Sequence, residues 1–173
     1  HENGKNVFEQ AGYQQYEIAA FSKPGFQCVH NLNYWLYGDF IAIGAGAHGK
    51  YTRPTGEIFR YEKKASPKKY MDSVINTEDC FFSIEKANKR TLILDFLMNY
   101  LRTKSGFTEQ ELFHKTGIQF NTVSDLFAQA KSQGFLKKQH NQWSSTSKGH
   151  QFLNDLLLLF TATAPDKSTL EPR

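Results

Sequence analysis

Residues 90–102 read RTLILDFLMNYLR, and this stretch decides how the second half of the chain is expected to fold. Leu94, Leu97, Met98 and Leu101 follow the i, i+3, i+4, i+7 spacing of a single helix face. The spacing predicts an amphipathic helix. The character of the chain changes near residue 84, from short mixed elements to mainly helical patterns.

The residues that follow predict three more helices and a hairpin. Thr108 and Glu111 have the spacing of a capping box, which would start a helix that Gly117 ends. The other expected elements are a helix over 120–134, a hairpin over 135–146 that turns near His140, and a helix over 147–160. This order predicts a helical, winged-helix-like domain over residues 76–162.

Residues 1–75 predict a mixture of short helices and strands, so the fold class is α+β. Helices are expected over 6–13, 29–35 and 68–74, the last one capped by Ser66 and Pro67. Strands are expected over 16–21, from 39 onward, and over 56–64. Residues 163–173 are expected to form a disordered tail.

The composition limits the class of protein. Aromatic residues make up 14% and hydrophobic residues 39% of the 173 residues, which favours a folded chain. There is no apolar run long enough for a membrane span and no opening signal peptide. The two cysteines, Cys28 and Cys80, lie far apart, which fits a reducing cytoplasm. The chain starts with His1, so we expect it to be cut from a longer protein or to carry a tag.

The net charge of +4 is concentrated in one segment, RYEKKASPKK from Arg60 to Lys69. This segment is either a solvated strand end and loop or a patch that attracts carboxylates or phosphates. Residues 108–160 hold five lysines and four acidic residues. Because a DNA-binding surface needs a cationic face, we expect no binding to nucleic acid. Docking against another domain is the favoured role of this module.

The stretch CVHNLNYW, from Cys28 to Trp35, gathers polar and aromatic groups in two helical turns. His30 and Tyr34 would share one helix face, and Asn31 and Trp35 an adjoining one. These residues either pack and satisfy nearby backbone groups, or they bind a flat, conjugated ligand. Tyrosine and tryptophan offer flat apolar surface, and a neutral imidazole can ligate iron.

The segment IGAGAHG carries glycines at positions 44, 46 and 49, beside His48. Glycines after a strand allow close approach of backbone to a ligand. Without a following helix the pattern is a weak signal, and His48 could equally be a surface imidazole.

Together these motifs resemble a known family. The stretch QAGYQQYEIAAFSKPGFQCVHNLNYWLYGDFIAIGAGAHGKY is similar to the anaerobic coproporphyrinogen III oxidase-like radical SAM proteins. The resemblance is closest to their HemW-type branch of haem chaperones and covers about residues 8–160. Ala19 and Ala20 depart from it, because many members carry Ser-Asn there.

The resemblance implies that this chain is only the C-terminal part of such a protein. It would contain the end of a partial TIM-like β/α barrel over 1–75, and the missing N-terminal half would be its partner. That half would hold a [4Fe–4S] cluster on a CxxxCxxC motif, with S-adenosylmethionine on the cluster. Two scattered cysteines cannot bind such a cluster, so this chain alone is expected to be inactive.

The resemblance also assigns site residues. His30, Asn31, Tyr34 and Trp35 match a motif associated with haem binding, with His30 as the candidate iron ligand. Gly44, Gly46, Ala47 and His48 match a segment expected near the S-adenosylmethionine and substrate cavity.

The expected function is haem binding and delivery to haem-accepting proteins. Two alternatives stay open: oxygen-independent oxidation of coproporphyrinogen III, and a plain winged-helix interaction module.

Overall fold

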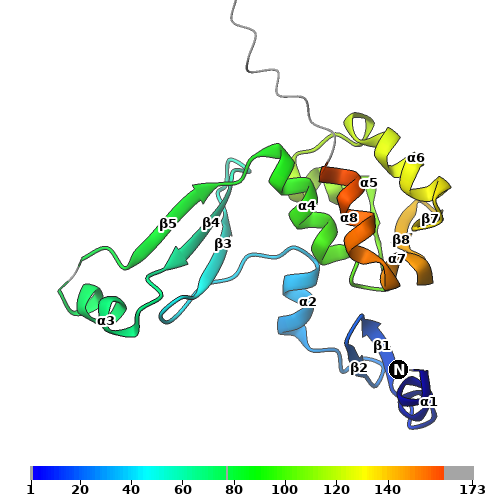
Figure 1. The fold of residues 1–173 in the computed structure, drawn as a ribbon, viewed down its shortest axis with the longest axis horizontal. Coiled ribbons are helices and arrows are strands. Elements are labelled where there is room, and N and C mark those ends of the chain that lie inside the picture. The colour runs from blue at the N-terminus through cyan, green and yellow to red at the C-terminus, as the bar shows by residue number, and fades with distance from the viewer. Residues whose placement is uncertain (1, 77, 162–173) are drawn as a thin grey trace, which may run out of the picture.

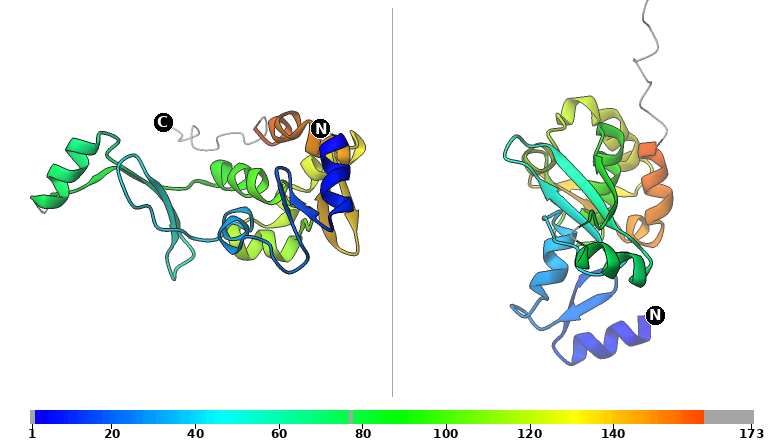
Figure 2. Two further views of the ribbon diagram at one scale, coloured as in Figure 1. Left: turned by 90° about the horizontal axis from the view of Figure 1, so that it is seen from below. Right: turned by 90° about the vertical axis from the view of Figure 1, so that its left-hand side faces the viewer.

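The computed structural model describes residues 2–76 and 78–161. Helices and sheets are mixed throughout, which confirms the α+β class. Figure 1 shows a helical body from which a three-stranded sheet and one helix project as an arm, and Figure 2 shows the arm at one end of the long axis. We call β3 (His48–Thr52), β4 (Ile58–Lys63), β5 (Phe81–Lys86) and α3 (Pro67–Ile75) the arm, and the elements from α4 (Lys89–Tyr100) onward the body.

The helix α4 (Lys89–Tyr100) lies at the centre of the main core, as RTLILDFLMNYLR predicted. Phe96, Leu97 and, just after the helix, Leu101 are fully buried. Met98, in contrast, is 48% exposed, although it follows the same helical spacing as Leu97 and Leu101. The apolar stripe is wider than one i, i+3, i+4 row, because helices pack on more than one side of α4. Its contacts include α2 (Val29–Trp35), α5 (Glu109–Thr116) and α8 (Leu153–Thr161).

The body forms as its local signals indicated. The capping box of Thr108 and Glu111 starts α5 (Glu109–Thr116), and Gly117 ends it with a φ of 70°. The hairpin β7 (Leu136–Gln139) and β8 (Gln142–Ser145) turns at His140 and Asn141, as expected. A short strand β6 (Phe107–Thr108), which the sequence did not predict, pairs with β8.

Two expected helices of the body are each divided. The segment over 120–134 begins with a single 3₁₀ turn, η1 (Phe120–Thr122), and continues as α6 (Ser124–Ser132). The segment over 147–160 forms α7 (Ser147–Gln151) and α8 (Leu153–Thr161). The backbone leaves the helical region at Phe152, with φ of −117° and ψ of 46°, which separates α7 from α8.

The N-terminal segment differs from expectation at residues 16–21. After α1 (Glu2–Gln10), the chain forms a hairpin of β1 (Gln14–Glu17) and β2 (Ala20–Ser22), and not one strand. The buried carboxylate of Glu17 accepts a hydrogen bond from the Ala19 N–H at 2.8 Å. This contact reverses the chain at Ile18 and Ala19 and prevents a continuous strand.

The next elements lead into the arm. The short helix α2 spans Val29–Trp35, as predicted. The expected strand from residue 39 is reduced to a single bridge between Phe40 and Lys50, and Ile41 and Ile43 are 83% and 85% exposed. The Ala42 N–H donates to the Tyr61 hydroxyl at 2.8 Å, so no strand can continue there.

The arm consists of three antiparallel strands and one helix. Its strands are β3 (His48–Thr52), β4 (Ile58–Lys63) and β5 (Phe81–Lys86), in that order, and α3 spans Pro67–Ile75. The Ser66 side chain caps α3, as expected, while β5 was not predicted. Every strand pairing among the described residues is antiparallel, whereas the strands of a β/α barrel run parallel. The pairings therefore do not confirm the expected end of a β/α barrel, which stays a prediction.

The predicted boundary near residue 75 falls between α3 and β5, and β5 pairs with β4 across it. The domain division stays a prediction, and the tail at 163–173 lies outside the described residues. Within those residues, no helix combines the length and apolarity needed to cross a membrane.

Replacing Leu97 by alanine should destabilise the chain by about 2–5 kcal/mol, because it leaves a cavity beside Phe96 and Leu101. Replacing the half-exposed Met98 by alanine should change the free energy of unfolding by about 0.5 kcal/mol or less. Urea denaturation of both variants measures the difference. Equal losses would show that the two neighbouring side chains are buried alike.

Candidate functional site

The helix α2 presents two different faces, as the spacing of its motif predicted. The His30 and Tyr34 rings meet edge to face at 4.9 Å between centroids on the first face. The Tyr34 ring also lies 4.2 Å from the Phe40 ring. None of the α2 side chains is fully buried, so the exposed imidazole of His30 is available to a ligand.

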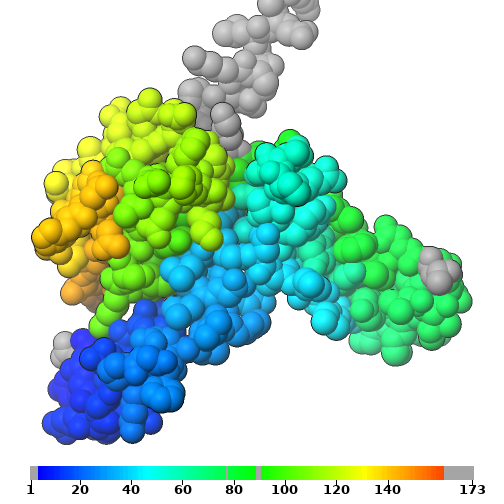
Figure 3. Space-filling model, turned by 180° about the vertical axis from the view of Figure 1, so that it is seen from behind, coloured from blue at the N-terminus to red at the C-terminus, as the bar shows by residue number. Residues whose placement is uncertain are grey.

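The first face of α2 borders a groove of about 740 Å³ between the helix and the arm. We call this the aromatic groove, because six rings line it: His30, Tyr34, Phe40, Tyr51, Tyr61 and Phe81. Its other lining residues are Ile41, Ile84, Asn33, Asp39 and Lys50. Its volume lies within the range of about 300–1,000 Å³ that is usual for small-molecule sites. Figure 3 shows the far end of the arm, in green, projecting from the rest of the molecule.

The sheet wall of the groove arises from strand pairing. Gly49 pairs with Tyr61, and Tyr51 with Phe59, so these residues share one face of the sheet. Tyr51 stacks on Phe59 at 5.2 Å, and Tyr61 meets Phe81 edge to face at 5.3 Å. A Cβ atom at Gly49 would overlap the Tyr61 ring, so only glycine allows that ring to lie across β3.

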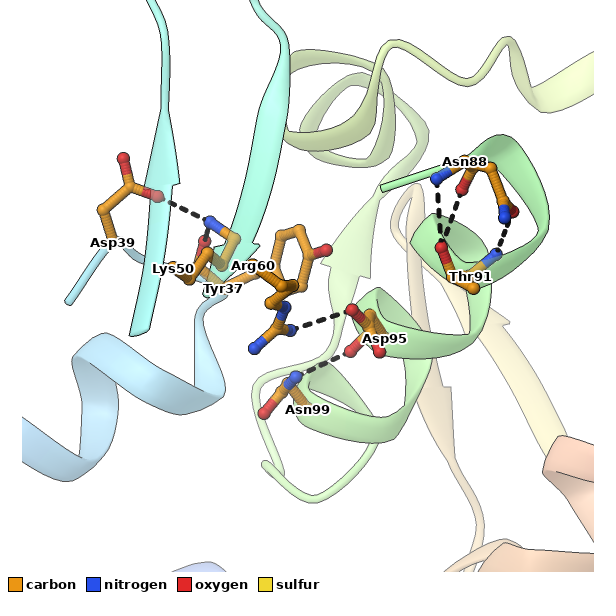
Figure 4. A network of polar contacts seen from close by, with 8 residues as sticks. All are labelled: Tyr37, Asp39, Lys50, Arg60, Asn88, Thr91, Asp95 and Asn99. Atoms are coloured by element: carbon orange, nitrogen blue, oxygen red, sulfur yellow. Dashed lines mark hydrogen bonds and ion pairs between the residues drawn. The ribbon is translucent and has the colours of Figure 1, made fainter. Parts of the chain in front are cut away.

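One end of the groove holds an ion pair between the buried Lys50 and the exposed Asp39, shown in Figure 4. The Lys50 ammonium, 3% exposed, donates to Asp39 Oδ1 at 2.7 Å and to the Tyr37 carbonyl at 3.1 Å. Burial lowers the pKa of Lys50, and the Asp39 carboxylate partly offsets this effect. Burial alone would raise the pKa of Asp39, but hydrogen bonds from Lys50 and Thr52 outweigh it and lower that pKa.

The second face of α2 turns away from the groove. The Asn31 amide donates to the Tyr16 hydroxyl at 3.4 Å, and the Arg102 guanidinium lies 4.6 Å from the Trp35 ring centroid. Arg102 also approaches Glu17 at 3.5 Å. The structure therefore brings His30 and Tyr34 together at the groove and places Asn31 and Trp35 against the hairpin and the end of α4.

The glycine-rich residues lie beside the end of β4 and do not line the groove. Gly44 and Gly46 have φ values of 102° and 68°, the left-handed region that favours glycine. The Gly46 N–H donates to the Lys64 carbonyl at 3.0 Å, and the Ala47 carbonyl accepts from the Lys63 N–H at 2.9 Å. His48 borders a smaller hollow of about 260 Å³ together with Arg60 and Glu62.

The cysteines are not arranged for a metal cluster. Cys28 is exposed, and Cys80 is half-buried with its thiol 3.1 Å from the Lys63 ammonium. In the part of the chain that the structure describes, no three His, Cys, Asp or Glu side chains form a group that could hold a metal ion. The described residues therefore do not fit an iron–sulfur cluster.

The sequence reasoning missed most of the groove wall. Phe59 and Tyr61 alternate with Arg60 and Glu62, a period-two signal that could have identified an aromatic sheet face. No local signal connects Phe81 with Tyr34, because their segments meet only through the tertiary fold.

Known proteins share this chain's sequence over most of its length. The haem chaperone HemW of Haemophilus influenzae is 40% identical over 159 residues, which cover 92% of this chain and 40% of that protein. The haem chaperone HemW of Escherichia coli is 39% identical over 93% of this chain and 41% of its own length. A mitochondrial relative from Mus musculus, radical S-adenosyl methionine domain-containing protein 1, is 29% identical over 91% of this chain and 37% of its own length.

Among solved structures, the coproporphyrinogen III oxidase HemN from Escherichia coli, a radical SAM enzyme, matches with a TM-score of 0.65. The match covers 93% of this chain and 40% of that protein at 13% identity, and it shows a shared fold. No protein-family model matches the chain.

The fold and the sequence matches place the chain among the coproporphyrinogen oxidase-like radical SAM proteins. Within that family it belongs to the HemW-type branch, and it matches the C-terminal part of those proteins. The chain spans about two fifths of the length of the curated relatives it matches.

Asp39 should make the stability of the chain depend on acid pH. Its pKa is lowered in the folded state, so its contribution is present above the unfolded pKa and is lost as pH falls through the folded pKa. We expect the Asp39→Asn variant to be less stable than the parent at pH 7, and the difference to shrink below about pH 4. Urea denaturation across this range measures it, with the exposed Asp72→Asn variant as the control. A constant difference at all pH values would contradict the role of the charge.

Proposed function

We propose that this chain is the haem-binding C-terminal part of a radical SAM haem chaperone. The observation that carries the proposal is the position of His30 and Tyr34 at the edge of a groove lined by aromatic rings. Curated relatives named haem chaperones support this role over porphyrinogen oxidation or a plain interaction module.

The residues of the groove fit the chemistry of haem. The aromatic rings offer flat apolar surface for a macrocycle, and an imidazole at the edge can ligate its iron. No other histidine lines the groove among the described residues. His30 would therefore be the iron ligand, with Tyr34 beside it as a packing surface. Asn31 and Trp35 would act indirectly, by holding α2 against Tyr16 and Arg102.

The remaining family properties belong to the whole protein. We infer that the missing N-terminal half supplies the barrel, the [4Fe–4S] cluster and S-adenosylmethionine, because the described part of this chain offers no cluster ligands. The glycine-rich segment from Gly44 to His48 would face that half. Haem-accepting proteins as partners and a cytoplasmic location stay predictions.

The body is best interpreted as a winged-helix-like module that docks on protein. The helices α5 and α6 followed by the β7–β8 hairpin support this interpretation. The exposed residues of α6 include Asp125, Gln129 and Lys131 and no arginine. A role in reading DNA is therefore disfavoured, because base recognition relies strongly on arginine.

Replacing His30 by alanine should weaken haem binding by at least about tenfold, the scale on which loss of even an outer-shell partner weakens a metal site. The Soret spectrum should change, because the iron loses its imidazole ligand. A haem titration followed by absorbance measures both effects.

Two matched variants control for this result. His48→Ala removes a histidine from a different hollow, and Lys68→Ala removes an exposed cation of α3. Both should bind haem like the parent. If His48→Ala loses haem while His30→Ala keeps it with an unchanged spectrum, the iron ligand is assigned to the wrong histidine.

The chain by itself should not cleave S-adenosylmethionine. Reductive cleavage needs an electron from a cluster, and Cys28 and Cys80 cannot supply the three thiolates that such a cluster requires. Anaerobic reconstitution with iron and sulfide, followed by an assay for 5′-deoxyadenosine, tests this. Product formed by this chain alone would refute it.

A further inference from the structure

We propose that Lys63 recognises the carboxylates of the ligand in the aromatic groove and thereby sets the direction in which the ligand enters. The inference rests on the proposed haem-binding function and deepens it. It follows from an asymmetry of charge at the groove. The Asp39 carboxylate lines one part of it, and the Lys63 ammonium, which is not itself a lining residue, lies over the Phe81 and Tyr61 rings that line another part.

The Asp39 end should repel a ligand carboxylate. The Asp39 side chain is 43% exposed and lines the groove. The Lys50 cation beside it is buried and already donates to Asp39 and to the Tyr37 carbonyl. A carboxylate bound there would compete with Asp39 for Lys50 and would lie beside a second negative charge, which is unfavourable.

The Lys63 end has the opposite character. The Lys63 ammonium lies 3.5 Å from the Phe81 ring centroid and 5.6 Å from that of Tyr61, and both rings line the groove. Its other contact is the Cys80 thiol at 3.1 Å. Among the described residues, no carboxylate forms an ion pair with Lys63. The cation is therefore free to receive a ligand carboxylate.

The two ends are separated by a distance that suits a large planar ligand. Asp39 bonds with Thr52, which pairs with Ile58, and with Lys50, which pairs with Arg60. Lys63 lies three to five residues further along β4, which corresponds to about 10–16 Å at the rise of a strand. A macrocycle lying on the rings between these ends would direct its carboxylates toward Lys63.

The other cations of the segment from Arg60 to Lys69 are less suited to this role. Arg60 is bonded to Asp95 at 2.9 Å on the opposite face of β4. The Lys64 ammonium donates to the Ser73 hydroxyl at 2.7 Å, and Lys68 and Lys69 are exposed on α3. The general patch predicted from the sequence is thus narrowed to one residue, and Lys68 becomes a matched control.

The experiment compares haem with haem dimethyl ester, which keeps the iron and the ring but has lost both negative carboxylates. Each ligand is titrated into the 173-residue chain and into Lys63→Gln, Lys63→Arg and Lys68→Gln, in one solvent and followed by the Soret band. Lys63→Gln should bind haem about two- to fivefold more weakly, the scale of a partly exposed charge pair. It should bind the ester like the parent. Lys63→Arg should restore haem binding, and Lys68→Gln should leave both ligands unaffected.

The other outcomes separate the two proposals. If Lys63→Gln weakens both ligands equally, Lys63 only supports the fold of the groove, and the inference is overturned. If haem and its ester bind the parent equally well, the carboxylates are not recognised, although haem binding itself stands. If the parent binds neither ligand, the proposed function fails and this inference fails with it.

Discussion

The buried Lys50 ammonium is the constraint on which the arrangement of the site depends. A buried cation is tolerated only when its charge and its N–H groups are satisfied. Asp39 and the Tyr37 carbonyl meet this need, and the ammonium also lies 4.3 Å from the Tyr37 ring centroid. Tyr37 adopts a φ of 58°, which is unusual for an aromatic residue, and its buried ring packs edge to face on Phe96. The contact between Lys50 and Tyr37 thus joins the strand β3, the end of α2 and the core around α4.

A second ion pair, between Arg60 and Asp95, joins the arm to α4 (Figure 4). The Asn99 side chain donates to the Asp95 carbonyl one helical turn further on. The two pairs together set the position of the sheet relative to α2. That position creates the aromatic groove, because Tyr34 comes from one element and Tyr61 and Phe81 come from two others. Burial also raises the pKa of Tyr37 to about 12, so this phenol stays neutral beside the two cations.

Local signals were reliable where the contacts that decide a structure are close in sequence. The capping box at Thr108, the turn at His140 and the two faces of α2 each depend on residues a few positions apart. The predictions of strands failed where a side chain from elsewhere, or a competing local side chain, bonded to the backbone. The Tyr61 hydroxyl accepts the Ala42 N–H and ends the strand expected there, and the Glu17 carboxylate turns a predicted strand into a hairpin. Met98 follows the spacing of Leu97 and Leu101 and is still half-exposed, because the i, i+4 pattern cannot say which positions of α4 meet a neighbour.

The sequence by itself determined the family, the helical body and the pairing of His30 with Tyr34. The order of the motifs and the helical periodicity depend only on which residues stand near one another in the chain. Only the tertiary structure decided that His30 and Tyr34 face a groove while Asn31 and Trp35 face Tyr16 and Arg102. It also placed Lys63, one of five cations in a run, over rings that line the groove. The physical reason is that the charge a ligand meets depends on which partners have already neutralised each side chain, and those partners lie far away in the chain.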